Sequence, residues 1–167
     1  MKKLLVILGP NGVGKSTTAK KFVELNEKTA YLDAEWCRAL NPFALTEATK
    51  QVVKENMYCL LRNYLYCNEI NTVVFPYGWH GDRRQIYEEV VERLRNDGID
   101  FTEYVIILKC SEKELLRRAL QDGRCEERVK RGMESTFNFY DGFDYPIIDT
   151  TDMTPLQVVE NIRLLIQ

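Results

Sequence analysis

Short apolar runs alternate along the chain with longer segments in which apolar residues recur at helical spacing. Most of the short runs are rich in branched aliphatic or aromatic residues and are bounded by Gly, Pro, Asn or Asp, which is typical of buried strands. They predict five strands, at residues 4–8, 29–32, 72–76, 101–108 and 145–148.

The longer segments predict amphipathic helices between the strands. Three of them lie at residues 13–25, 46–68 and 82–96, and the last begins at Thr154-Pro155. A further helix follows Ser111, which can cap it, with Glu114 as the other half of a capping box. Because strands and helices alternate throughout, we expect an α/β fold with a parallel sheet covered by helices on both faces.

A glycine-rich turn joins the first predicted strand to the first helix. Its sequence fits the pattern G-x-x-x-x-G-K-[ST] in the strand–loop–helix context that the pattern requires, and reads Gly9-Pro10-Asn11-Gly12-Val13-Gly14-Lys15-Ser16-Thr17. Its glycines let backbone N–H groups converge on an anion at the positive end of the helix. Lys15 can reach the β- and γ-phosphates of a nucleotide, and the Ser16 hydroxyl can ligate Mg²⁺.

Two acids follow the second predicted strand. Asp33 lies at the carboxyl end of that strand, where ligands gather in open parallel sheets, and Glu35 comes two positions later. If the chain is extended there, one carboxylate can serve Mg²⁺ and the other can orient an acceptor hydroxyl. No acid ends the strand at 72–76, so Asp33 is the candidate metal ligand beside Ser16. The alternative is a helix start whose dipole the acids complement.

Arginines dominate residues 117–131, and the apolar pattern stops from residue 121 onwards. We interpret residues 121–131 as a flap in which Arg124 and Arg128 neutralise charge on a transferred phosphoryl group and exclude water. A solvated charged helix is the alternative, since these two arginines have helical spacing. Arg118 can stack on an adenine ring or form a surface ion pair, and Thr150 can face adenine or lead into the last helix.

The segment after the third predicted strand is aromatic and glycine-rich. Tyr77, Gly78 and Trp79 suit the wall of an acceptor pocket at the carboxyl edge of the sheet. His80 is the only histidine of the chain, and a surface or hydrogen-bonded role is favoured over catalysis.

Composition narrows the range of partners. With 167 residues and a net charge of -2, the chain has the size of one domain, and its balanced charge disfavours binding to a nucleic-acid backbone. No apolar stretch is long enough to span a membrane. The five cysteines are odd in number and form no C-x-x-C pair, which argues against disulfides and a zinc site and favours the cytoplasm.

Together these residues resemble the small P-loop kinases, a group with shikimate kinase, gluconate kinase, chloramphenicol phosphotransferase and the kinase part of polynucleotide kinases. The matching segments are the Walker A loop at 9–17, the acidic pair Asp33-x-Glu35, the LID at 117–131 and the adenine-side ending Ile148-Asp149-Thr150-Thr151. The resemblance implies a three-layer P-loop NTPase fold with five parallel strands in the order 2-3-1-4-5, one domain over residues 1–167, and ATP with Mg²⁺ as cofactors. Two departures stand out: Glu35 replaces an aspartate of several relatives, and the bulky residues 76–79 argue against shikimate as the acceptor.

We therefore expect an ATP-dependent kinase that transfers a γ-phosphoryl group to a hydroxyl of a small molecule, which the sequence does not identify. The expected catalytic residues are Lys15, Asp33, Glu35, Arg124 and Arg128. The expected nucleotide-binding residues are Gly9, Pro10, Asn11, Gly12, Val13, Gly14, Lys15, Ser16, Thr17, Arg118 and Thr150. Two alternatives stay open: a regulatory nucleotide-binding module, and a polynucleotide 5′-kinase that holds a terminal nucleotide with Arg38 and Trp79.

Overall fold

The computed structural model describes residues 1–42, 44–123 and 125–167, apart from the side chains of residues 128, 131 and 135. The strands are β1 (Lys2–Leu8), β2 (Thr29–Tyr31), β3 (Thr72–Pro76), β4 (Phe101–Lys109) and β5 (Ile147–Asp149). The helices are α1 (Lys15–Leu25), α2 (Ala34–Cys37), α3 (Glu47–Tyr66), α4 (Arg83–Asn96), α5 (Glu112–Gln121), α6 (Glu126–Thr136) and α7 (Pro155–Leu165).

The strands form one parallel sheet in the order β2-β3-β1-β4-β5. This is the order implied by the resemblance to the small P-loop kinases, so the expected fold is confirmed. The central strand β1 is buried from Leu4 to Leu8, because it has neighbouring strands on both sides and helices on both faces. That burial explains why its sequence is continuously apolar instead of alternating.

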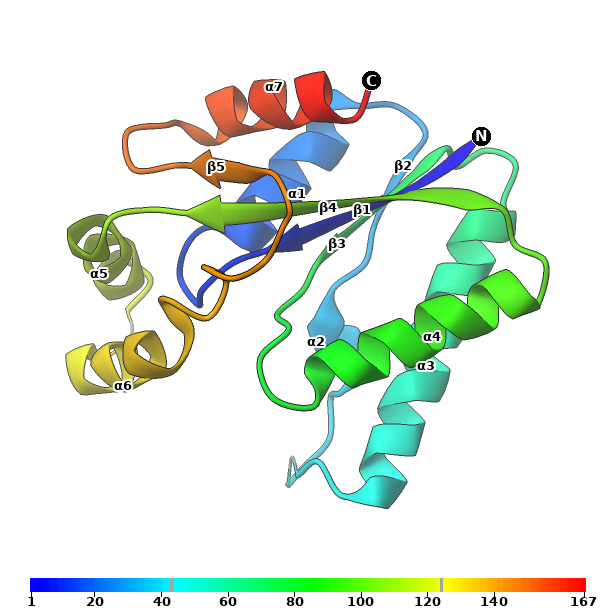
Figure 1. Ribbon diagram of the computed structural model, residues 1–167, viewed down its shortest axis with the longest axis horizontal. Coiled ribbons are helices and arrows are strands. Elements are labelled where there is room, and N and C mark those ends of the chain that lie inside the picture. The colour runs from blue at the N-terminus through cyan, green and yellow to red at the C-terminus, as the bar shows by residue number, and fades with distance from the viewer. Residues whose placement is uncertain (43, 124) are drawn as a thin grey trace.

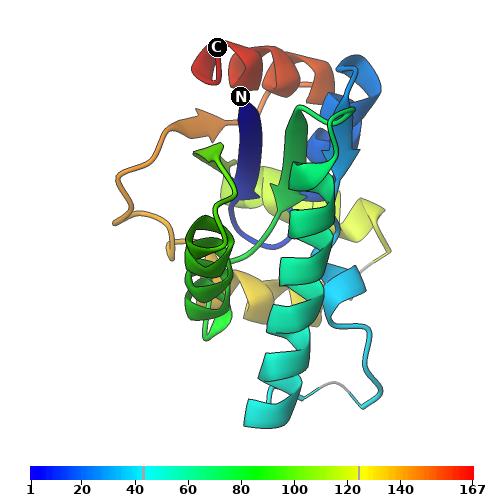
Figure 2. The same ribbon diagram turned by 90° about the vertical axis from the view of Figure 1, so that its right-hand side faces the viewer.

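Helices cover both faces of the sheet (Figure 1). Successive side chains of a strand point to opposite faces, so β1 contributes to two cores. Leu4, Val6 and Leu8 join residues of α3 and α4, whereas Leu5 and Ile7 join residues of α1 and α7. Figure 2 shows α3 and α4 packed side by side on their face of the sheet.

Three local features differ from the expectations or decide between them. β5 begins at Ile147 instead of residue 145, because Pro146 has no N–H to donate and contributes only its carbonyl oxygen, which accepts from Ile107. The short helix α2 follows β2, so Asp33 and Glu35 lie at a helix start and not on extended chain. The described part of 121–131 is largely helical, since it holds the end of α5 and the first half of α6.

The start of α5 confirms one half of the expected capping box. The Ser111 hydroxyl accepts a hydrogen bond from the Glu114 N–H. The Ser111 N–H donates to the Thr151 hydroxyl instead of to Glu114, whose carboxylate accepts from Arg117 and Arg118. These contacts tie the start of α5 to the segment that follows β5.

Within the described ranges, none of the helices combines the length and apolar character needed to cross a membrane.

Candidate functional site

Two cavities flank the loop that follows β1, at the carboxyl edge of the sheet. The first has a volume of about 300 Å³ and is lined by the loop, the start of α2, the segment after β3 and the start of α4. The second has a volume of about 280 Å³ and is lined by the loop, α5 and the segment after β5. Gly12 and Gly14 line both cavities. In Figure 1 the arrowhead of β1 points into this loop, close to α5.

The backbone of the loop requires glycine. Gly9 has a φ of 139° and Gly14 a φ of 104°. A Cβ at Gly9 would lie 2.4 Å from the carbonyl oxygen of Leu108, so no side chain fits there. Gly14 is the N-cap of α1, whose first turn has neither a side-chain cap nor an acidic residue. No carboxylate of α1 therefore competes with a phosphate for the positive end of the helix.

Lys15 and Ser16 lie at the start of α1 and line the first cavity. The Lys15 Nζ donates hydrogen bonds of 2.9 Å to the carbonyl oxygens of Gly9 and Pro10. The side chain thus folds back over its own loop and places its charge beside the backbone that the pattern assigns to phosphate binding.

Asp33 lies between β2 and α2 and has both of its carboxylate oxygens engaged. Oδ1 accepts from the Glu35 N–H at 3.0 Å, which makes Asp33 the N-cap of α2, and Oδ2 accepts from the Tyr31 hydroxyl at 2.8 Å. Burial, followed by the bond to Asp33, raises the pKa of Tyr31 to about 12, so this hydroxyl stays protonated and donates at neutral pH. Tyr31 also interacts with the Ser16 side chain, which links the two candidate metal ligands.

Glu35 lies on α2, so the helix-start alternative describes this segment. Its side chain is 68% exposed and forms an ion pair with Arg38, the C-cap of α2. Asp33 and Glu35 nevertheless line the same cavity as Lys15 and Ser16. The two interpretations of these acids, as a helix start and as a pair beside the phosphates, are therefore compatible.

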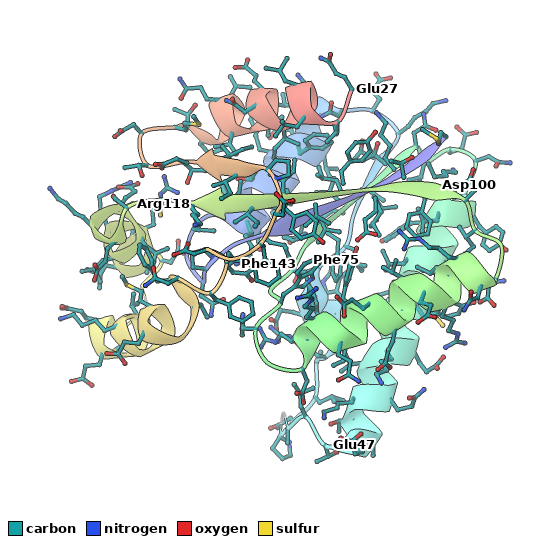
Figure 3. All side chains as sticks on the ribbon, viewed as in Figure 1. Glu27, Glu47, Phe75, Asp100, Arg118 and Phe143 are labelled. Carbon is teal, nitrogen blue, oxygen red and sulfur yellow. The ribbon has the colours of Figure 1, made fainter. Side chains whose placement is uncertain are left out.

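Arg118, which Figure 3 labels on α5, lines the second cavity together with Thr150. The guanidinium donates to the Val13 carbonyl oxygen at 2.8 Å and to the Thr150 hydroxyl and carbonyl oxygens at 3.0 and 2.6 Å. Glu114 accepts from Arg118 at 2.7 Å and from Arg117 as well, and these bonds lower the pKa of Glu114 to about 2. Arg118 thus connects α5 to the loop and to the end of β5. Its ion pair with Glu114 is only one of these contacts.

The two arginines expected in the flap are only partly covered by the structure. Arg124 lies outside the described residues. Arg128 falls within α6, but its side chain is not described. Lys130 of the same helix forms an ion pair with Glu126, as expected for a solvated charged helix.

The segment after β3 divides between cavity and core. Tyr77 and Gly78 line the first cavity, as expected for an acceptor wall. Trp79 was wrongly expected on that wall, because it is 2% exposed and packs among Tyr87, Phe143 and Tyr145. Trp79 packs in the core against aromatic residues on α4 and after α6, and no local pattern indicates that long-range contact.

Sequence reasoning missed Arg83, the first residue of α4, which lines the first cavity together with Asp33 and Lys15. Its Nη1 lies 2.6 Å from the Nε2 of His80. The spacing of the two residues in the sequence is a weak signal, because any helix start can hold an arginine. His80 is half-buried and takes the hydrogen-bonded one of its two expected roles, as the partner of Arg83, which lines the cavity.

In the described part of the chain, no cluster of three or more His, Cys, Asp or Glu side chains could hold a metal ion by itself. A divalent ion at Ser16 and Asp33 would therefore need oxygen ligands from a phosphate or from water.

Comparison with known proteins places this geometry in a family. A family model described as "AAA domain" matches residues 5–138. A search of curated proteins finds no match.

Solved structures resemble the whole chain. The tunicamycin resistance protein of Deinococcus radiodurans has a TM-score of 0.66 at 18% identity, with 99% of this chain and 96% of that chain covered. A gluconokinase from Sinorhizobium meliloti has a TM-score of 0.61 at 14% identity, with 99% and 98% covered. Shikimate kinase from Aquifex aeolicus has a TM-score of 0.56 at 17% identity, with 98% and 95% covered. At these identities the likeness establishes the fold, and with the family match it leads to one conclusion: the chain belongs to the AAA domain family and has the fold of the small P-loop kinases.

Proposed function

We propose that the chain is an ATP-dependent kinase that transfers the γ-phosphoryl group to a hydroxyl of a small-molecule acceptor. The observation that carries this proposal is the first cavity, which Lys15, Ser16 and Asp33 line together with the segment after β3. A module that only binds a nucleotide and signals to a partner needs no such space beside its phosphate-binding loop. The kinases among the similar structures support the same reaction class.

Bound ATP would supply the phosphoryl group, and Mg²⁺ would neutralise charge on its phosphates. The backbone of residues 9–17 and the Lys15 Nζ would bind the phosphates, and Ser16 and Asp33 would ligate the metal or its water. The Lys15 charge would stabilise the transition state once its bonds to Gly9 and Pro10 give way to phosphate oxygens.

Asp33 would also hold the acceptor hydroxyl. Each of its oxygens accepts one hydrogen bond, and a carboxylate oxygen has a second lone pair for a further partner. The Tyr31 hydroxyl fixes the orientation of the carboxylate, and Glu35, in the first turn of α2, would act as its partner at the cavity.

The second cavity would hold the base of the nucleotide. Arg118 and Thr150 line it, and the guanidinium presents a flat surface on which an adenine ring can stack. Residues 121–131 would close over the phosphates as a LID within a single domain, with Arg124 and Arg128 neutralising charge during transfer.

The first prediction concerns Asp33→Asn. The amide keeps the cap of α2, because its oxygen can still accept the Glu35 N–H, but it can neither take a proton nor ligate Mg²⁺ strongly. We expect the rate of phosphoryl transfer to fall by about 100- to 10,000-fold, the range of general acid–base catalysis, while nucleotide affinity changes little.

The measurement is ADP release over a panel of hydroxylated metabolites, nucleosides and oligonucleotides, read above the release by the protein alone. Asp100→Asn serves as the matched control, because this exposed aspartate directly precedes β4, at the opposite end of the strand from the site. Equal turnover by Asp33→Asn and the wild type would refute the assignment. Stimulation by oligonucleotides alone would favour the polynucleotide kinase alternative.

A further inference from the structure

Arg83 is an arginine that lines the first cavity. It is half-buried at the start of α4. Among the described residues, no carboxylate forms an ion pair with it, although its neighbour Arg84 pairs with Glu88 and Arg38 pairs with Glu35. Asp82, the adjacent N-cap of α4, pairs with Lys50 instead.

The position of Arg83 makes this unpaired charge costly. The N-terminus of a helix carries a partial positive charge, so a cation in the first turn of α4 is unfavourable. Burial and then the neighbouring Arg38 lower the pKa of Arg83 by more than Tyr77, Glu35 and Tyr140 raise it, so on balance its surroundings oppose the charge. A guanidinium nevertheless stays protonated in proteins, so the charge remains.

His80 and Gly78 hold Arg83 in this position. A guanidinium has no acceptor, so the His80 Nε2 accepts from the Arg83 Nη1 at 2.6 Å and the proton of the imidazole is on Nδ1. A Cβ at Gly78 would lie 2.8 Å from the His80 Cε1, so glycine makes room for the pair. A neutral imidazole orients the guanidinium but does not neutralise it. The side chain thus lines the cavity with no ion pair to any carboxylate of the described residues.

Among the described residues, the carboxylates that line the cavity, Asp33, Glu35 and Asp122, form no ion pair with Arg83. Asp33 accepts from Tyr31 and Glu35, and Glu35 pairs with Arg38. Building on the kinase activity proposed above, we propose that the acceptor is an anionic molecule whose carboxylate or phosphate group binds Arg83, while its hydroxyl faces Asp33. The fork of the guanidinium matches either anion with two parallel hydrogen bonds. Because both residues line one cavity of about 300 Å³, the acceptor has the size of a hydroxy acid or a sugar phosphate.

The test observes Arg83 directly and needs no knowledge of the natural acceptor. Protein labelled with ¹⁵N-arginine is saturated with Mg²⁺ and the non-hydrolysable analogue AMPPNP, which occupies the phosphate-binding loop. Its side-chain Nε–Hε signals are then followed during titration with sodium phosphate and, separately, with sodium acetate, at constant ionic strength kept with sodium chloride. The Arg83 signal is the one missing from Arg83→Gln. Arg62, an exposed arginine of α3 that lines neither of the two cavities, is the control and is assigned in the same way with Arg62→Gln.

We expect a saturable shift of the Arg83 signal with a midpoint in the millimolar range, and no saturation at Arg62. The stronger of the two anions distinguishes a phosphorylated from a carboxylated acceptor. Arg83→Lys keeps the charge but loses the fork, so with any acidic acceptor that stimulates ADP release it should raise KM less than Arg83→Gln, for which we expect a rise of about 10- to 100-fold.

An Arg83 signal that responds to neither anion, or that responds no differently from Arg62, would overturn the proposal. Failure of the kinase function would look different, because AMPPNP would then leave the amide signals of Gly14 and Lys15 unchanged before any anion is added. An acceptor without charge that is phosphorylated equally well by the wild type and Arg83→Gln would also contradict the inference.

Discussion

At the scale of single residues, the polar side chains of the cavity are ordered by hydrogen bonds within the protein. Tyr31 donates to Asp33, the loop carbonyls accept from Lys15, and His80 accepts from Arg83. Each bond fixes a group before any ligand arrives, which lowers the entropy that binding must overcome. The cavity is therefore preorganised by the residues beside it and not only by the loop.

His80 provides a residue-scale prediction on pH. Burial, followed by the nearby cations Arg83, Lys15 and Arg38, lowers its pKa from 6.5 to about 4 in the folded protein. Between these two pH values the unfolded chain binds a proton more readily than the folded protein does. The contribution of His80 to the free energy of unfolding is therefore complete above pH 6.5 and is lost as the pH falls toward 4.

Urea unfolding of the wild type and His80→Gln at a series of pH values from neutral to about 4 measures this contribution. Glutamine keeps an oxygen that accepts from Arg83 but does not titrate in this range, so we expect the variant to lose less stability than the wild type on acidification. Parallel stability curves for the two proteins would show that His80 titrates normally.

At the scale of elements, the segment after α6 is fastened to the segment after β3. The Tyr140 hydroxyl accepts a 3.0 Å hydrogen bond from the Trp79 N–H and interacts with the backbone of Gly9. Tyr140 also packs against Phe143, which packs against the core cluster that contains Phe75 of β3; Figure 3 labels both phenylalanines. Any movement of α6 over the phosphates is thus limited by an anchor in the core.

Tyr140→Phe tests that anchor. The variant keeps the ring but leaves the buried Trp79 N–H without its partner, so we expect a loss of about 1–3 kcal/mol in the free energy of unfolding. Tyr66→Phe is the matched control, since Tyr66 is 54% exposed at the end of α3 and should change stability little. Chemical denaturation of the two variants side by side gives the comparison, and equal stabilities would mean that the anchor contributes nothing.

Sequence reasoning predicted the elements with strong periodicity and gave those without it, α2 and α6, only as alternatives. The strands and the long helices were found because their apolar spacing follows from burial on one face or both. α2 is four residues long, too short to show a period. In α6 the many charged residues obscured the apolar pattern. Val129 and Met133 are nevertheless buried at helical spacing, which indicates an amphipathic helix.

The residues of the site likewise divide into those that the local sequence predicts and those that it does not. The loop at 9–17 and the acids after β2 were predicted because their local sequence determines their place at the sheet edge. The pair of His80 and Arg83 and the burial of Trp79 depend on which elements pack beside the segment after β3. Such contacts arise from the tertiary structure, and no local pattern encodes them.

At the scale of the whole molecule, one sheet edge collects everything that the proposed reaction needs. The parallel strands bring the ends of β1, β2 and β3 to the same side, where the loop separates two cavities. Arg118 connects α5 to that loop on one side, and Arg83 of α4 lies on the other. The proposed division is a base on the α5 side and an acceptor on the α4 side, with the phosphates between them.

The most direct test of this account is isothermal titration calorimetry of the wild type and Lys15→Ala with ATP and GTP in the presence of Mg²⁺. We predict saturable binding of at least one nucleotide to the wild type. Lys15→Ala should bind it about 10- to 100-fold more weakly, because one charge-assisted contact to the phosphates is lost. If neither nucleotide produces heat with the wild type, or if Lys15→Ala binds as tightly as the wild type does, the loop after β1 is not the phosphate site and the account is contradicted.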